Sequence, residues 1–125
     1  MDLSRSHIFV VDDDFAVRRA LKFALELEGL PIHTCAGGEE LLRHPDLARA
    51  ACVVVDRKMP GMDGFAVTQE LSARGIAAPV ILIAAEIDNA IRNRAARAGI
   101  VEVLEKPLQG TVLSDAIRMA VQAAS

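Results

Sequence analysis

Acidic residues and one lysine stand where short apolar segments of the chain end. Three aspartates, residues 12–14, follow the string IFVV, Asp56 follows CVVV, and Lys106 follows VEVLE. Two carboxylates about 4 Å apart repel by about 4 kcal/mol at an effective dielectric constant of about 20, so such a cluster needs a counter-charge. Mg²⁺ accepts carboxylate oxygens together with water and phosphate. An aspartate beside that cation and a lysine suits phosphoryl acceptance, because the reaction needs mainly positioning and charge neutralisation.

The segments that must position these residues alternate five times between strand-like and helix-like patterns. Strands are expected at 7–12, 31–35, 51–55, 79–84 and 101–104. Three of them are continuously apolar, which is typical of strands covered on both faces of a parallel sheet. Helices are expected at about 14–28, 38–43, 63–75, 88–99 and 111–123.

Apolar spacing predicts which helical residues face the core. Val17, Leu21 and Leu25 form the expected stripe of the first helix. Other residues expected to widen that stripe are Ala20, Ala24 and Leu27, and those expected to share one face of the fourth helix are Ile91, Ala95 and Ala98.

The alternation predicts an α/β fold: a doubly wound, five-stranded parallel sheet in three α/β/α layers, formed by one domain over residues 1–125. Ligands of such sheets bind beyond the carboxyl ends of the strands. The three aspartates, Asp56 and Lys106 all fall at such ends. Taken singly, each has a simpler interpretation: the three aspartates as helix caps, Asp56 as a turn residue before a proline, and Lys106 as a surface lysine. Their occurrence together at the ends of three strands favours a site.

Composition excludes several other classes of function. The net charge of −3 gives no broad attraction to nucleic acid or to a membrane surface, and no apolar run approaches the ~20 residues of a membrane helix. We therefore expect a cytoplasmic protein with no direct nucleic-acid or membrane partner. Cys35 and Cys52 lie in apolar stretches and are expected to be buried free thiols. The spacing of His7, His33 and His44 argues against a zinc site.

Four strings of the sequence stand out: VVDDD (with Arg18 following), VVVDRKMPGMDG, PVILIAA and AGIVEVLEKPL. They resemble those of the receiver (CheY-like) family of response regulators, and the resemblance covers about residues 8–121. That resemblance implies a flavodoxin-like (βα)5 fold. The EKPL ending resembles receivers of the nitrogen-fixation regulator type, which usually precede a DNA-binding helix-turn-helix domain.

The resemblance assigns a metal-assisted phosphorylation site. Asp56 matches the residue phosphorylated by a histidine kinase or phosphotransferase. Asp13 matches the direct ligand of Mg²⁺ (or Mn²⁺), Asp12 the carboxylate that holds it through water, and the backbone carbonyl of Lys58 the third protein ligand.

Further roles follow from the same resemblance. Lys106 would contact the phosphoryl group, as would the backbone N–H groups of Lys58 and Ala85. The Lys106–Pro107 bond resembles the family's cis peptide. Gly64 would let the loop after Asp56 turn tightly.

Two positions depart from the family. Ala84 replaces the usual Thr or Ser of the fourth strand, and Val103 replaces the usual aromatic residue of the fifth. These are the switch positions, so we expect chemistry at Asp56 to survive while its coupling to the rest of the domain is weakened or rewired. Lys58 and Glu86 occupy positions that tune phosphoryl lifetime; they form either an ion pair across the pocket or two solvated side chains.

Surfaces for partners are expected beside the site and on the far helices. Arg18 and Arg19 open the first helix close to the site, where the family resemblance implies that kinases and phosphotransferases often dock. Arg92, Arg94 and Arg97 of the fourth helix are either a solvated face or part of a surface for an output domain or a second receiver. That surface would comprise the fourth helix, fifth strand and fifth helix.

Two rival functions remain. An aspartate-nucleophile phosphatase of the haloacid dehalogenase type needs a second Asp at the position of Lys58, so no enzyme is expected beyond self-phosphorylation and dephosphorylation. No GxxxxGK[ST] or GxGxxG string follows any strand, which argues against a nucleotide-binding enzyme. A phosphorylation-independent pseudo-receiver acting by docking or dimerisation is favoured by Ala84 and Val103 but opposed by the retained acidic residues and Lys106.

Overall fold

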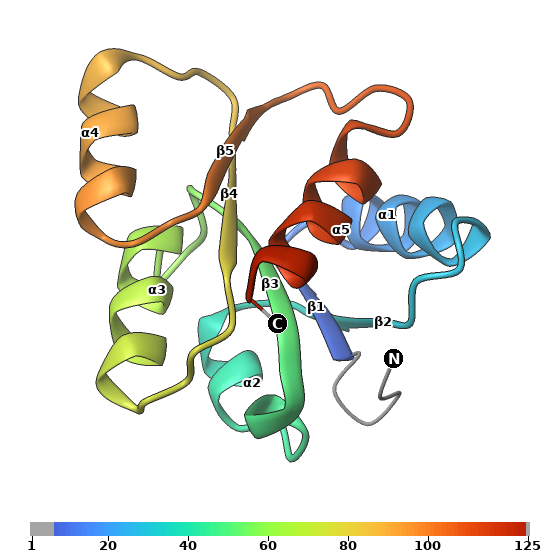
Figure 1. The fold of residues 1–125 in the computed structure, drawn as a ribbon, viewed down its shortest axis with the longest axis horizontal. Helices are drawn as coiled ribbons and strands as arrows, with labels where there is room; N and C mark the ends of the chain where they lie inside the picture. The colour runs from blue at the N-terminus through green and yellow to red at the C-terminus, as the bar shows by residue number, and fades with distance from the viewer. Residues whose placement is uncertain (1–6, 125) are drawn as a thin grey trace.

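The computed structural model describes residues 7–124 of the chain, and its centre is one parallel sheet of five strands (Figure 1). The strands are β1 (His7–Val11), β2 (Ile32–Cys35), β3 (Ala50–Asp56), β4 (Val80–Ala84) and β5 (Glu102–Glu105). Their order across the sheet is β2-β1-β3-β4-β5. The chain first extends the sheet to one side of β1 and then to the other, so strand order reverses between β1 and β3. The carboxyl ends of these two strands are therefore where a ligand is expected.

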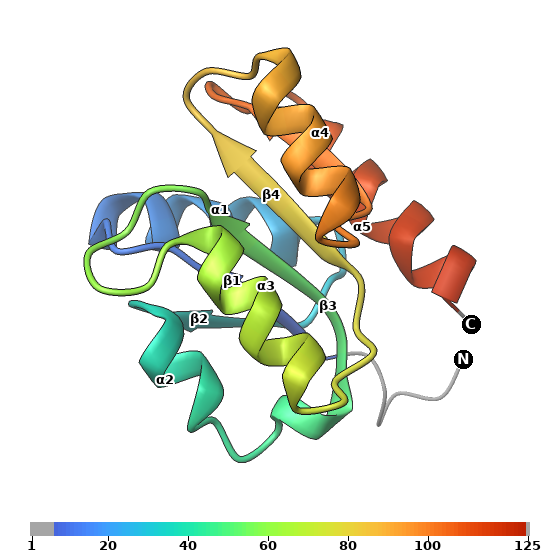
Figure 2. The ribbon, with the colours of Figure 1, turned by 90° about the vertical axis from the view of Figure 1, so that its left-hand side faces the viewer.

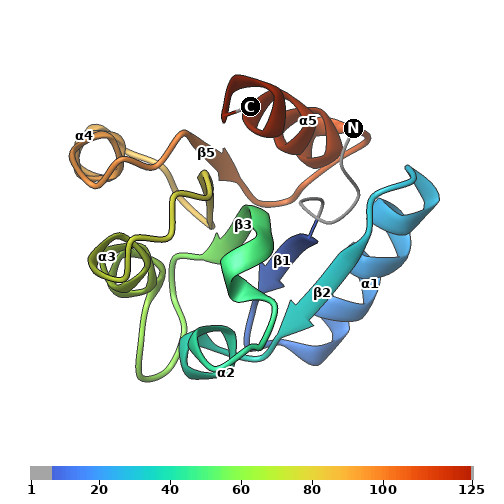
Figure 3. The ribbon, with the colours of Figure 1, turned by 60° about the horizontal axis from the view of Figure 1, so that its bottom comes forward.

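Helices cover both faces of the sheet. They are α1 (Phe15–Leu27), α2 (Gly38–Leu42), α3 (Gly64–Ala73), α4 (Asn89–Arg97) and α5 (Val112–Ala124), with a short 3₁₀ helix, η2 (Leu47–Arg49). α1 and α5 lie on one face, and α2, α3 and α4 on the other (Figures 1 and 3). The predicted doubly wound, three-layer α/β/α fold is confirmed.

Two apolar cores, one on each face, explain why the central strands are continuously apolar. On β1, Phe9 and Val11 pack under α2, α3 and α4, whereas Ile8 and Val10 pack under α1 and α5. All four are at most 2% exposed. Successive side chains of a strand point to opposite faces, so a strand buried on both sides shows no polar alternation.

Aspartates begin three of the helices. The carboxylate of Asp14 accepts hydrogen bonds from the backbone N–H groups of Ala16 and Val17 at the start of α1. Asp63 and Asp88 cap α3 and α4 in the same way. A side-chain oxygen at this position satisfies an N–H group that has no partner within the helix. Gly29 follows the end of α1 with φ of +81°, the left-handed conformation expected there.

The buried stripes of α1 and α4 are narrower than predicted. Leu25 of α1 is buried and Val17 and Leu21 are half-buried, but Ala20, Ala24 and Leu27 are exposed, Leu27 by 72%. On α4, Ile91 and Ala95 are buried but Ala98 is exposed. Those parts of the prediction were wrong, because only the residues of each helix that pack into the two cores are removed from solvent. η2 was not predicted, because its three residues carry no periodic signal.

The carboxyl ends of the strands lie at one edge of the molecule. Figure 2 shows the arrowheads of β3 and β4 at the same end of the sheet. No helix within the described residues is long and apolar enough to cross a membrane.

Candidate functional site

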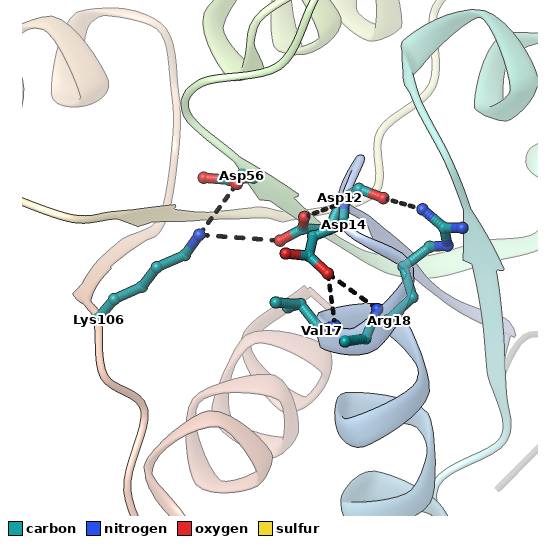
Figure 4. A network of polar contacts seen from close by, with 7 residues as sticks. Asp12, Asp14, Val17, Arg18, Asp56 and Lys106 are labelled. Carbon is teal, nitrogen blue, oxygen red and sulfur yellow. Dashed lines mark hydrogen bonds and ion pairs between the residues drawn. The ribbon is translucent and has the colours of Figure 1, made fainter.

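Three of the predicted site residues meet at the carboxyl edge of the sheet (Figure 4). Asp12 directly follows β1 and is 3% exposed, and Asp56 ends β3 and is 8% exposed. β1 and β3 are neighbours in the sheet, so their ends bring these two carboxylates side by side. Lys106 follows β5, two strands beyond β3, and its long side chain reaches back past the end of β4.

Lys106 connects the two buried aspartates. Its Nζ donates a hydrogen bond to Asp56 Oδ2 at 3.0 Å and lies 3.9 Å from Asp12 Oδ2. Burial alone would lower the pKa of the Lys106 ammonium, but the hydrogen bond to Asp56 and the negative charges of Asp56, Asp12 and Asp13 outweigh it and raise that pKa. Lys106 therefore stays charged, and its positive charge is held between the carboxylates.

The backbone around Lys106 fixes where its side chain begins. Lys106 N donates to the carbonyl of Ala84 at 2.9 Å, which extends the pairing of β5 with β4 by one residue. The Lys106–Pro107 bond is cis, as the family resemblance implied.

Three carboxylates at this edge could hold a metal ion. Oxygens of Asp12, Asp13 and Asp56 all lie within 4.8 Å of one another; Asp13 is exposed and the other two are buried. Burial raises the pKa of the Asp12 carboxyl, and the nearby charges of Asp56 and Asp13 raise it further, against the hydrogen bond from Asp14 N and the charge of Lys106. These three carboxylates offer only oxygen ligands, are partly open to solvent and have too little positive charge beside them. Such a group of ligands fits Mg²⁺ or Mn²⁺ better than a softer metal.

Hydrogen bonds from α1 hold Asp12 in place. Its Oδ1 accepts from Asp14 N at 2.9 Å, and its backbone carbonyl accepts from Arg18 Nη1 at 2.7 Å. The guanidinium of Arg18 also lies 5.6 Å from the ring centroid of Phe15. Arg18 thus contacts the backbone of the site, a role that its position in the sequence did not reveal.

Two glycines shape the loop after Asp56. Arg57 N donates to the carbonyl of Ile83 at 2.8 Å, and Gly64 N donates back to the carbonyl of Arg57 at 2.9 Å, which closes the loop. The left-handed turn falls at Gly61, with φ of +79°, and not at Gly64. A Cβ at Gly64 would stand 2.8 Å from the backbone oxygen of Asp56, so Gly64 is required for close approach and not for the turn itself.

Within residues 7–124, the remaining predicted residues form no hydrogen bond or ion pair with the carboxylates of this site. Lys58, Ala85 and Glu86 are exposed, and among residues 7–124 no hydrogen bond or ion pair joins Lys58 to Glu86. Ala84 is 1% exposed at the end of β4. Val103 pairs with Leu82 and is half-buried against the core under α4.

The arginines of α4 differ from one another. Arg92, Arg94 and Arg97 are all exposed, but the guanidinium of Arg94 lies 4.0 Å from the ring centroid of Phe65 on α3. Arg94 is therefore packed on a neighbouring helix, in a cation–π geometry.

Comparison with known proteins identifies relatives with this fold. The pattern of the response regulator receiver domain matches residues 8–118. The transcriptional regulatory protein FixJ of Bradyrhizobium diazoefficiens is 30% identical over 97% of this chain and 59% of its own length. The C4-dicarboxylate transport transcriptional regulatory protein DctD of Pseudomonas aeruginosa is 32% identical over 95% of this chain and 26% of its own.

A solved structure agrees with these matches. The crystal structure of FixJ-N superposes with a TM-score of 0.83 at 32% identity, covering 93% of each chain. The chain thus spans about 59% of FixJ and about a quarter of DctD. Given the match over residues 8–118 and the shared fold, the chain belongs to the response regulator receiver domain family of two-component systems.

Proposed function

We propose that the chain is a phosphorylation-competent receiver domain that accepts a phosphoryl group on Asp56 from a histidine kinase or a phosphotransferase. The observation that carries the proposal is the position of Lys106 Nζ, 3.0 Å from Asp56 Oδ2 and 3.9 Å from Asp12 Oδ2, beside a carboxylate cluster able to hold a cation. FixJ and DctD, both named as transcriptional regulatory proteins, support the same assignment.

The transfer forms one bond and breaks one. An oxygen of Asp56 attacks the phosphorus of phosphohistidine, the P–N bond breaks, and the departing imidazole nitrogen takes up a proton. Asp12, Asp13, Asp56 and the backbone carbonyl of Lys58 would hold Mg²⁺ or Mn²⁺, which supplies positive charge to the phosphoryl oxygens. Lys106 supplies a further charge, and the backbone N–H groups of Lys58 and Ala85 would donate to the same oxygens.

Signalling after phosphorylation would differ from that of receivers with a hydroxyl at the end of β4. The side chain of Ala84 has no hydroxyl to donate to a phosphoryl oxygen, and a charge-assisted hydrogen bond of that kind contributes about 1.5–3 kcal/mol. Val103 has no ring to reorient. We infer that coupling from Asp56 to the face formed by α4, β5 and α5, where an output domain or a second receiver would bind, is weakened or follows another route. Lys58 and Glu86, exposed beside the site, would set the lifetime of the phosphoryl group.

The test is phosphorylation by a small donor. The protein is incubated with acetyl phosphate and Mg²⁺, and the phosphoryl adduct is measured by intact mass. Asp56→Asn removes the acceptor, and Asp115→Asn is the matched control because it removes one carboxylate from an exposed position on α5. We expect a single adduct in the native chain and in Asp115→Asn, and none in Asp56→Asn or with excess EDTA. An adduct that persists in Asp56→Asn contradicts the proposal.

A second candidate, a phosphorylation-independent docking module, is favoured by Ala84 and Val103. The same experiment separates the two. Absence of any adduct in the native chain, together with no Mg²⁺-dependent change in thermal stability on adding beryllofluoride, would favour docking.

A further inference from the structure

Three histidines far apart in the sequence meet at the end of the sheet opposite to Asp56. His7 is the first residue of β1, His33 is the second residue of β2, and His44 lies in the loop after α2. His7, Phe9 and His33 share the sheet face that α2 covers, because His7 is two residues before Phe9 and His33 is the register partner of Phe9. Figure 3 brings this end of the molecule forward. β1 is five residues long, so its two ends are about 13 Å apart.

The contacts place nitrogen donors next to a carboxylate. His7 Nδ1 and His33 Nε2 are 2.8 Å apart, and their rings stack with centroids 5.0 Å apart. Donor atoms of His7, His33 and Asp46 all lie within 4.8 Å of one another, and each of the three residues is half-buried. The site is therefore open to solvent on one side and backed by the core on the other.

Neighbouring residues hold two of these side chains. The ring of Phe9 stacks on His33 with centroids 5.0 Å apart. His44 packs edge-on against both Phe9 and His33, and its Nδ1 accepts a hydrogen bond from Asp46 N at 3.1 Å. That bond ties the loop carrying Asp46 to the cluster. His44 thus acts as a positioning residue and is not one of the three donors.

The surroundings of His33 combine burial with several nearby charged groups. Burial lowers the pKa of His33, and the nearby His7, His44 and Lys22 lower it further, whereas Asp46 opposes the shift. Metals bind the neutral imidazole. Asp46 adds the negative charge that a divalent cation needs beside two imidazole ligands.

We propose that His7, His33 and Asp46 form a second metal site that binds a divalent transition metal of the Zn²⁺ class, with solvent as the fourth ligand. Two imidazole nitrogens and one carboxylate are the ligands that Zn²⁺ takes where one position stays open. Tetrahedral Zn²⁺ sets its nitrogen ligands about 3.3 Å apart, so the two rings need to separate by roughly half an ångström from their present hydrogen bond. The proton in that hydrogen bond moves to the other nitrogen of its ring, so both facing nitrogens present lone pairs.

This site differs from the carboxylate cluster in position and chemistry. It joins the edge strand β2 to β1 and to the loop before η2, three segments that adjoin only through tertiary contacts. Cys35, two residues after His33 on the same strand face, is not among the donor residues whose atoms lie within 4.8 Å of one another. The inference does not depend on phosphorylation of Asp56.

The test is a calorimetric titration of tag-free protein with Zn²⁺ while Mg²⁺ in millimolar excess occupies the carboxylate cluster. Co²⁺ is titrated in parallel, because tetrahedral coordination gives intense visible bands. The variants are His7→Asn, His33→Gln and Asp46→Asn, and Asp115→Asn is the matched control, since it removes one carboxylate from an exposed position on α5. Phosphorylation by acetyl phosphate is measured on each variant to show that the fold and Asp56 are intact.

We expect one Zn²⁺ per chain, an affinity reduced at least about tenfold in each ligand variant, and an affinity within about threefold of the native value in Asp115→Asn. Should His33→Gln fail to fold, Asp46→Asn carries the test alone, because it changes one group on a half-exposed loop. Absence of a one-to-one complex at micromolar Zn²⁺ would overturn the proposal. So would an affinity unchanged by Asp46→Asn and His7→Asn, or a loss in Asp115→Asn as large as in the ligand variants.

Discussion

Lys106 donates a hydrogen bond to Asp56 at 3.0 Å across a sheet in which β4 separates their strands. The ammonium group therefore lies beside Asp56, where the proposed phosphoryl transfer would need positive charge. The contact exists in the unmodified chain, so the carboxylate of the proposed acceptor is held in place before any donor arrives.

Lys106→Ala should slow phosphorylation by acetyl phosphate at least about tenfold, which corresponds to about 1.4 kcal/mol of barrier. Without divalent cations, the substitution should also lower the free energy of unfolding by about 1 kcal/mol. The cost is modest because the lysine side chain is 35% exposed. Intact-mass time courses and urea unfolding measure the two effects. Lys22→Ala is the matched control, since Lys22 forms an exposed ion pair with Glu26. Equal phosphorylation rates in Lys106→Ala and Lys22→Ala would refute the assigned role.

Asp12→Asn should raise the melting temperature by a few degrees at pH 7 without divalent cations. The folded chain raises the pKa of Asp12, so it binds more protons than the unfolded chain between the ordinary pKa and the raised one, and stability falls as pH rises through that window. The variant lacks this penalty and should be less pH-dependent there. Asparagine keeps an oxygen to accept from Asp14 N.

Calorimetric melting of Asp12→Asn with and without Mg²⁺ provides the measurement. The increase in melting temperature on adding Mg²⁺ should be smaller in the variant than in the native chain. A variant that melts below the native chain at pH 7 without metal would show that the charge of Asp12 stabilises the fold.

Gly64→Ala should destabilise the fold by about 1–3 kcal/mol and slow phosphorylation. The new Cβ would stand 2.8 Å from the backbone oxygen of Asp56 and 2.6 Å from Leu82 Cδ1, so the loop must move away from the acceptor. Gly37→Ala serves as control, because a Cβ there meets no atom within 4 Å; it should cost at most about 1 kcal/mol through weaker capping of α2. Chemical denaturation of both variants gives the comparison, and equal costs would contradict the close-approach argument.

Ala84→Thr should increase the stabilisation that beryllofluoride with Mg²⁺ gives the protein. Ala84 is 1% exposed, so a hydroxyl there lacks a partner until a phosphoryl-like group arrives, and the new hydrogen bond is worth about 1.5–3 kcal/mol. Ala84→Val introduces a side chain of the same shape as threonine but without the hydroxyl. It therefore separates the effect of the new hydrogen bond from the effect of the added packing volume. The difference in melting temperature with and without beryllofluoride is the quantity compared. The same difference in Thr and Val variants would mean that the missing hydroxyl is not what limits the switch.

Cys35 and Cys52 should resist thiol reagents in the folded chain up to about pH 10. Burial raises the pKa of each thiol to about 12, with the charge of Glu40 adding to the effect at Cys35, and both side chains are at most 1% exposed. Only the thiolate reacts. Mass spectrometry after iodoacetamide treatment should find both cysteines unlabelled in native protein and both labelled in urea. Rapid labelling of native Cys35 at pH 8 would place that thiol at the surface.

The sequence by itself determined the order of strands and helices along the chain and the edge of the sheet at which the site lies. Continuous apolar runs of four to six residues predict strands covered on both faces, and the alternation with helical periodicity implies a parallel sheet. In such a sheet every carboxyl end faces the same edge, so Asp12, Asp56 and Lys106 could be placed together from their positions alone. Helix caps at Asp14, Asp63 and Asp88 are local, because the capped N–H groups lie within three residues.

Tertiary structure decided what depends on the packing of segments distant in sequence. The approach of Gly64 to Asp56, the bond from Arg18 to the carbonyl of Asp12 and the exposure of Leu27 follow from how helices rest on the sheet. The spacing of His7 and His33 argued against a metal site, yet their nitrogens are 2.8 Å apart. Parallel pairing of β1 with β2 aligns residues that are 24 positions apart in the sequence, as Phe9 and His33 are, and no local spacing rule predicts that proximity.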